Sequence, residues 1–134
     1  MTSVEILIPL KAKPQGSKNA FVVNGRAVIA EASKGFKPWR SEVARIIRTS
    51  ADGWEMPDKD DPIGVVIHFI YKQPKSSTRA FFTIKPDIDK LSRAMLDAIT
   101  EAGNIWHDDQ QVIYLEAWKS YGSADEIRLL VKNV

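Results

Sequence analysis

The sequence predicts an α+β fold in which two main helices pack on a mixed β-sheet. Two observations support this prediction. Short runs rich in Val, Ile and Phe alternate along the chain with two longer stretches whose apolar residues recur at three- and four-residue steps. The chain has 134 residues and a hydrophobic content of 44%, without internal repeats, so we expect a single domain over residues 1–134.

The first half of the chain is expected to contain a strand, a hairpin and a helix. Apolar residues alternate over residues 4–10, ending around Pro9, as in a strand with one buried face. An Asn24-Gly25 pair between two β-branched runs predicts a tight hairpin. A helix follows with Pro38 in its first turn. Its expected buried stripe comprises Trp39, Val43, Ile46 and Ile47.

The second half is expected to add a helix between strands. Residues 63–71 are almost continuously apolar, which is typical of a central strand. The second helix should begin at Ile88 and stop at Gly103-Asn104, because glycine readily adopts the backbone conformation that ends a helix. Two further strands are expected, from about residue 111 to 121 and near 126–132.

Composition limits the classes of function. The chain has no cysteine, which excludes disulfides, thiolate zinc sites and cysteine nucleophiles. It has no apolar run of membrane-spanning length and no signal-peptide pattern, so we expect a cytoplasmic protein without a membrane partner. The net charge of +2 is only mildly basic, but basic residues are concentrated in the first 40 positions and between residues 72 and 93. If the chain also has a metal site, this distribution of basic residues favours a polyanionic substrate.

Four carboxylates flank the second predicted helix. Asp87 and Asp89 lie at its start, where the helix dipole favours anions, and Asp108 and Asp109 follow its end. Carboxylates that converge repel one another unless a cation neutralises them, and hard oxygen ligands select Mg²⁺, Mn²⁺ or Ca²⁺. The helix is roughly 22 Å long, so Asp109 meets Asp87 only if the chain folds back past the helix start. We therefore expect a divalent-metal site.

Each of these residues also has a structural interpretation. Asp87 could simply cap the helix, and Asp108 could start a turn. Asp89, Arg93 and Asp97 follow one another at four-residue spacing, which also suits a row of ion pairs on a helix surface.

A second nuclease pattern is weaker. Pro86-Asp87 begins the dispersed motif that pairs Pro-Asp with Glu-x-Lys. The nearest partner is Glu116-Ala117-Trp118-Lys119, in which the lysine comes one step too late. Because side chains alternate along a strand, Glu116 and Lys119 should also lie on opposite faces.

Several motifs occur in order around the second helix: Asp87-Ile88-Asp89, Leu96-Asp97-Ala98-Ile99, Ala102-Gly103 and Asp108-Asp109-Gln110-Gln111-Val112. Together they resemble the RusA family of Holliday-junction resolvases, endodeoxyribonucleases mostly derived from phages or prophages. The resemblance is clear over residues 85–112. It is weaker in the first strand, the 14–19 loop and the first helix.

The resemblance implies a RusA-like fold and a homodimer that nicks two strands of a four-way DNA junction symmetrically. It implies Mg²⁺, for which Mn²⁺ would substitute, and no organic cofactor. The family's acidic triad falls on Asp87, Asp89 and Asp109, with Asp108 as a further possible metal ligand. Residues 104–107 are one residue longer than the usual link, so Asp108 and Asp109 both remain candidates for the third position. The host would be a bacterial or phage-infected cell.

The family's basic residue falls on Arg93, where lysine is more common. Arginine keeps the charge and can grip a phosphate with two hydrogen bonds, but it is a poor proton donor. Beside this catalytic role, Arg93 belongs to the residues that we expect to contact DNA: Lys18, Lys75, Arg79, Lys85, Lys90 and Arg93.

The alternative function is a non-catalytic DNA-junction-binding protein of phage origin. Its acids would hold a structural ion or none, and Arg93 in place of lysine would fit reduced activity. The substitution Asp89→Asn separates the two functions, because it should abolish cleavage by an enzyme and leave junction binding intact.

Overall fold

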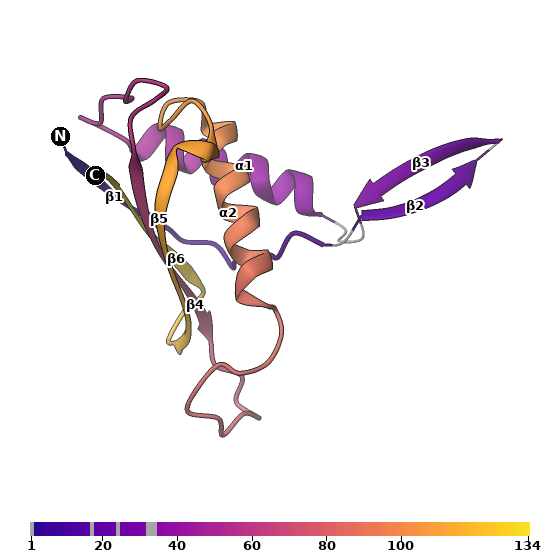
Figure 1. The fold of residues 1–134 in the computed structure, drawn as a ribbon. Coiled ribbons are helices and arrows are strands. Elements are labelled where there is room, and N and C mark those ends of the chain that lie inside the picture. Colours follow the sequence, from indigo (N-terminus) through magenta and orange to yellow (C-terminus); the bar gives the residue numbers. More distant parts are fainter. Residues whose placement is uncertain (1, 17, 24, 32–34) are drawn as a thin grey trace.

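The computed structural model describes residues 2–16, 18–23, 25–31 and 35–134, and it describes no side chains between residues 17 and 34 except at position 25. Over these residues the chain forms six strands, two α-helices and one 3₁₀ helix (Figure 1). In order they are β1 (Ser3–Ile8), β2 (Lys18–Val23), β3 (Arg26–Glu31), α1 (Phe36–Ser50), β4 (Ile63–Lys72), α2 (Ile88–Ala102), η1 (Asp109–Gln111), β5 (Val112–Gly122) and β6 (Glu126–Asn133). The predicted α+β architecture is confirmed.

Four strands form one mixed sheet in the order β1-β6-β4-β5. β4 pairs in parallel with β5 and antiparallel with β6, so it lies inside the sheet as its apolar sequence predicts. The parallel pairing requires a long crossover, which α2 provides. Consequently α2 begins near the end of β4 and finishes near the start of β5.

The hairpin β2–β3 forms a separate two-stranded sheet and extends away from the four-stranded sheet (Figure 1). Its two strands pair antiparallel with Val23 opposite Arg26. Gly25 in the predicted turn has a φ of 78°, a conformation that glycine adopts without steric cost. Asn24 lies outside the described residues. The hairpin prediction is confirmed for its strands.

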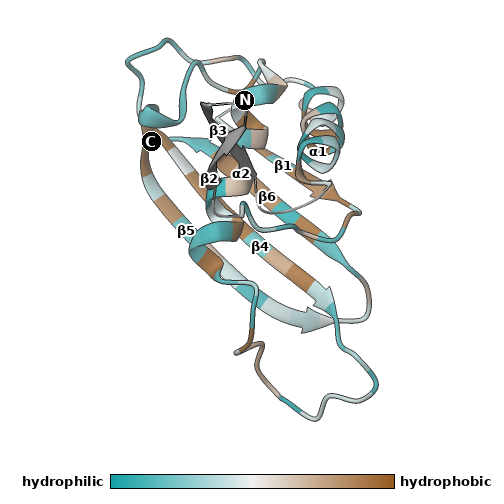
Figure 2. Ribbon diagram, turned by 90° about the vertical axis from the view of Figure 1, so that its right-hand side faces the viewer, coloured by the Kyte–Doolittle hydropathy of each residue, from teal (hydrophilic) through white to brown (hydrophobic). Residues whose placement is uncertain are grey.

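Both long helices cover the same face of the four-stranded sheet (Figures 1 and 2). In α2 the apolar residues Leu91, Met95, Ala98, Ile99 and Ala102 are buried, whereas Ile88 at the helix start is exposed. Trp39, Trp54 and Trp106 join the core. In α1 the buried stripe includes Phe36 and Ala44, whereas Ile46 is only partly buried at its margin. Within the described part of the chain, neither helix has the length and apolar composition of a membrane span.

Two boundaries differ from the sequence prediction. β1 ends at Ile8, because Pro9 has no N–H to donate to a strand ladder. The strand expected from residue 111 begins one residue later, since Gln111 belongs to the 3₁₀ turn η1 rather than to β5. This turn determines where the second pair of acidic residues lies.

Candidate functional site

The first acidic pair lies at the start of α2. Asp87 occupies the N-cap position with an extended backbone, and its carbonyl accepts a 3.1 Å bond from the Leu91 N–H. Its carboxylate does not cap the helix. Asp89 follows in the first turn, and both side chains are exposed. Among the described residues, no hydrogen bond or ion pair engages either carboxylate, so both are available to an external cation.

Lys119 on β5 anchors the segment that leads into α2. Its Nζ donates to the carbonyl of Ile84 at 2.7 Å and to that of Pro86 at 2.9 Å. It also lies 4.7 Å from the ring centre of Phe82. These contacts fix the backbone on both sides of Lys85 and hold Asp87 in place relative to the sheet.

Glu116 has a different surrounding. Its carboxylate accepts hydrogen bonds from Tyr114 and Trp118, which lie on the same strand face. Lys119 instead reaches the lead-in segment of α2, as the alternation along β5 predicts. The two side chains form no Glu-x-Lys site. No local pattern around Lys119 signals its anchoring role.

The second acidic pair lies in the η1 turn. The Asp108 carboxylate accepts a 2.8 Å bond from the Asp109 N–H, so Asp108 does start a turn. The Gln111 side chain is buried: Oε1 accepts from the N–H groups of His107 and Asp108, and Nε2 donates to the carbonyls of Asp58 and Asp61. Gln111 thereby ties the turn to the loop before β4.

Asp109 is partly buried, and its pKa is raised. Desolvation is the largest cause, followed by the negative charge of Asp108, a hydrogen bond that the protonated Asp109 carboxyl donates to Asp108, and the charge of Asp97. Asp97 lies more than two turns beyond the start of α2. Asp109 lies in the η1 turn, which follows the end of α2 and contacts that helix.

The structure thus brings the acids together as two separate pairs. Asp87 and Asp89 lie at the start of α2, and Asp108 and Asp109 lie in the η1 turn that follows its end. Over the described residues, no three Asp, Glu, His or Cys side chains are grouped closely enough to hold a metal ion. Asp87, Asp89 and Asp109 do not converge within one chain.

Arg93 is exposed on α2, one turn beyond Asp89. Neither Asp89 nor Asp97 forms an ion pair with it in the described structure, where the ion pairs join other residues. The predicted row of surface ion pairs is therefore not formed. The Arg93 guanidinium is available to an anion.

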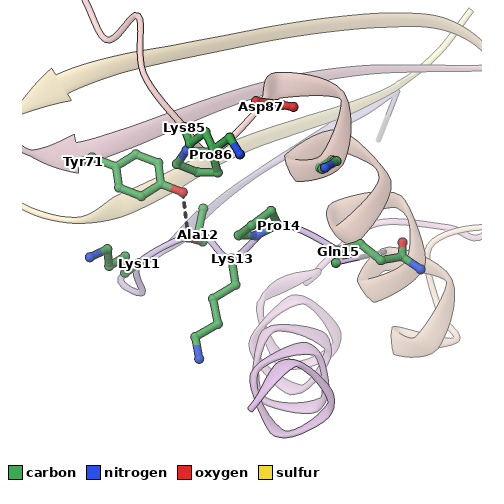
Figure 3. Close-up of a pocket in the computed structure, with 11 residues that line it drawn as sticks. Lys11, Ala12, Lys13, Pro14, Gln15, Tyr71, Lys85, Pro86 and Asp87 are labelled. Atoms are coloured by element: carbon green, nitrogen blue, oxygen red, sulfur yellow. Dashed lines mark hydrogen bonds between the residues drawn. The ribbon is translucent and has the colours of Figure 1, made fainter. Parts of the chain in front are cut away.

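The other basic candidates lie in several places. Lys85 and Lys90 line a cavity together with Asp87 (Figure 3), and Lys75 lines an adjoining cavity. Arg79 is exposed in the loop between β4 and α2. Lys18 belongs to β2, but its side chain lies outside the described part.

Lys11 and Lys13 are not among the binding residues predicted from sequence. Both line the cavity that contains Asp87 (Figure 3). Their only sequence signal is the general excess of basic residues in the first 40 positions.

These features define a small α+β domain with free carboxylates at a helix start, next to unpaired basic side chains suited to a polyanion. The family model for the endodeoxyribonuclease RusA matches residues 11–132, nearly the whole chain. This chain therefore belongs to the RusA family of endodeoxyribonucleases, which resolve Holliday junctions, and its partner is DNA. A search of curated proteins found no match. The resemblance noted around the second helix is confirmed over a much longer stretch.

Proposed function

We propose that this chain is a metal-dependent, structure-selective endonuclease that resolves four-way DNA junctions by paired symmetric nicks. The observation that carries the proposal is the exposed pair Asp87 and Asp89, which has no partner among the described residues and lies beside a cavity lined by lysines. An enzyme that cleaves a phosphodiester needs carboxylates for a cation and positive groups for the backbone, and both occur here within a few residues.

Mg²⁺ fits the first acidic pair, and Mn²⁺ should substitute for it. Magnesium needs only one or two protein carboxylates, because waters and substrate phosphate oxygens complete its shell. Asp87 and Asp89 supply such oxygens. When bound, the ion would neutralise charge at the scissile phosphate and make a bound water more acidic. Asp108 and Asp109, the other two expected ligands, form a separate pair in one chain, so their part is tested by mutation.

The protein's own residues would position the DNA. Arg93 lies one turn beyond Asp89, so its planar guanidinium can hold a phosphate through two hydrogen bonds. Because arginine is a poor proton donor, its proposed role is to bind charge and not to protonate the leaving group. Lys85 and Lys90 neutralise backbone phosphates beside Asp87.

A homodimer is part of the proposal. A four-way junction has approximate two-fold symmetry, and paired nicks require two active sites. Two copies of the chain related by a two-fold axis supply both.

The test is cleavage of a labelled synthetic four-way junction, beside a linear duplex of the same sequence, with Mg²⁺, with Mn²⁺ and with a chelator. We expect paired nicks that are confined to the junction and require the metal. Tight junction binding without cleavage under either metal would overturn the proposal in favour of the non-catalytic binding protein. Equal cleavage of the linear duplex would contradict the proposed selectivity for four-way junctions.

A further inference from the structure

Two adjoining cavities form one groove beside the start of α2. The first has a volume of about 510 Å³ and includes Asp87 in its wall (Figure 3). The second has about 470 Å³ and shares Lys11, Tyr71, Lys85 and Pro86 with the first. We call this continuous feature the lysine groove, defined by Lys11, Lys13, Lys72, Lys75, Lys85 and Lys90.

The lysine groove carries a strong excess of positive charge. Among the described lining residues, the six lysines are accompanied by two carboxylates, those of Asp87 and Asp125. In the described part of the chain, none of the six ammonium groups forms an ion pair. Clustered cations of this kind repel one another and favour a polyanion along the groove.

The walls between the lysines are apolar, and the aromatic rings behind them are buried: Tyr71 is 5% exposed and Phe82 is 8% exposed. The rings of Tyr71 and Phe82 lie 4.9 Å apart, and those of Phe82 and Tyr121 lie 4.8 Å apart. The Tyr71 hydroxyl is fixed by a 2.6 Å bond to the Ala12 carbonyl (Figure 3). Pro14 and Pro86 complete the first cavity. Duplex DNA presents mainly phosphates to such a surface, whereas an unstacked base needs an apolar surface, which Pro14 and Pro86 offer here.

The volumes and the walls together indicate one occupant. Cavities of roughly 300–1,000 Å³ hold small molecules, so each cavity has room for a nucleotide. We propose that the lysine groove binds an unpaired DNA strand, with lysines on the phosphates and an unstacked base against the apolar walls. A strand laid along the groove passes Asp87 and is thereby led to the acidic pair. The inference rests on the proposed function, because a branch point is where strands leave the duplex.

The test compares two probes of equal charge: an eight-nucleotide thymidine oligomer and an abasic oligomer with the same number of phosphates. Binding of each to the full chain is measured by fluorescence anisotropy without added metal. We expect the thymidine oligomer to bind at least about fivefold more tightly, since burial of a base against the apolar walls of the cavities adds affinity. Equal affinities would overturn the proposal, because the groove would then bind phosphates alone.

A double substitution tests the location. Lys11→Gln with Lys13→Gln should weaken binding of the thymidine oligomer about tenfold or more. It should also lower the slope of log affinity against log salt by about 0.7 for each phosphate that the lysines no longer neutralise. Lys59→Gln is the matched control, because Lys59 is exposed in the loop before β4, outside both cavities. An unchanged slope in the double variant, with an unchanged melting temperature, would overturn the assignment.

Measuring junction cleavage by the wild-type chain distinguishes failure of the lysine-groove proposal from failure of the proposed endonuclease function. Metal-dependent nicking together with equal binding of the two oligomers would overturn only the groove. Preference for the thymidine oligomer without any nicking would support the groove and overturn the proposed enzymatic function.

Discussion

The two acidic pairs that flank α2 look alike in sequence, but the structure gives them different surroundings. At the start of α2 the carboxylates of Asp87 and Asp89 are exposed and have no described partner, while Lys119 holds the backbone that precedes them. In the η1 turn the Asp108 carboxylate already accepts a backbone hydrogen bond, and Asp109 is partly buried. The first pair is therefore available to bind a cation, whereas in the second pair the Asp108 carboxylate caps the η1 turn.

The largest expected effect separates the two pairs by activity. Asp87→Asn or Asp89→Asn should reduce junction cleavage by about 10²–10³-fold, because several kcal/mol of metal-derived stabilisation are lost, and should leave junction binding intact. Asp108→Asn keeps a side-chain oxygen that can cap the turn, so less than a tenfold loss is expected. The measurement is the single-turnover rate of nicking.

Asp109→Asn decides whether the pairs act together. A loss within about tenfold would agree with a site built on Asp87 and Asp89. A loss as large as that of Asp89→Asn would show that the η1 turn joins the metal site on DNA, and it would contradict the separation of the two pairs.

The next effect concerns the anchor of the first pair. Lys119→Met removes a charged donor from the Ile84 and Pro86 carbonyls, at a cost of about 1.5–3 kcal/mol in unfolding free energy. We expect the nicking rate to fall about tenfold and amide hydrogen exchange at residues 84–89 to increase. Lys132→Met is the control, since Lys132 also lies over a ring, that of Tyr114, but its ammonium holds no described carbonyl. Normal exchange in Lys119→Met would contradict the anchoring role.

The anchor of the second pair should affect stability more than catalysis. Gln111→Ala leaves buried N–H and carbonyl groups unpaired, so the free energy of unfolding should fall by about 1–3 kcal/mol. Urea denaturation measures this. Gln110→Ala is a neighbouring control, because Gln110 is exposed. Similar stabilities of the two variants would show that the Gln111 bonds are not needed to hold the turn.

The smallest effect is the pH dependence from Asp109. The raised pKa of Asp109 means that the fold favours its protonated form. Its contribution to stability is complete below the ordinary value of 3.8 and is lost as the pH rises through the raised pKa. Asp109→Asn removes this contribution, so the variant should lose less stability than the wild type as the pH rises from acidic to neutral.

Urea denaturation of the wild type and of Asp109→Asn at a series of pH values measures how the free energy of unfolding of each depends on pH. Asp60→Asn, an exposed substitution in the loop before β4, controls for a general change in net charge. Parallel curves for Asp109→Asn and the wild type would contradict the effect of burial on Asp109.

Local patterns predicted much of the fold and the position of Asp87 and Asp89 at the start of a helix. The apolar stripe and Gly103 define α2 from Ile88 to Ala102, and the same stretch places Asp87 and Asp89 at its start. The apolar run of β4 indicated an interior strand. These predictions succeeded because helix periodicity, strand burial and helix termination depend on neighbouring residues.

The sequence by itself determined the α+β class, both helices and the acidic helix start. Only the tertiary structure decided which distant residues meet. The parallel pairing of β4 with β5 places Asp109 near Asp97, and it brings Lys119 to carbonyls more than thirty residues earlier in the chain. Packing of the whole chain also assembles the lysine groove from the loop after β1, from β4 and from the start of α2. Such contacts depend on strand order, and strand order follows from packing of the whole chain and not from any local pattern.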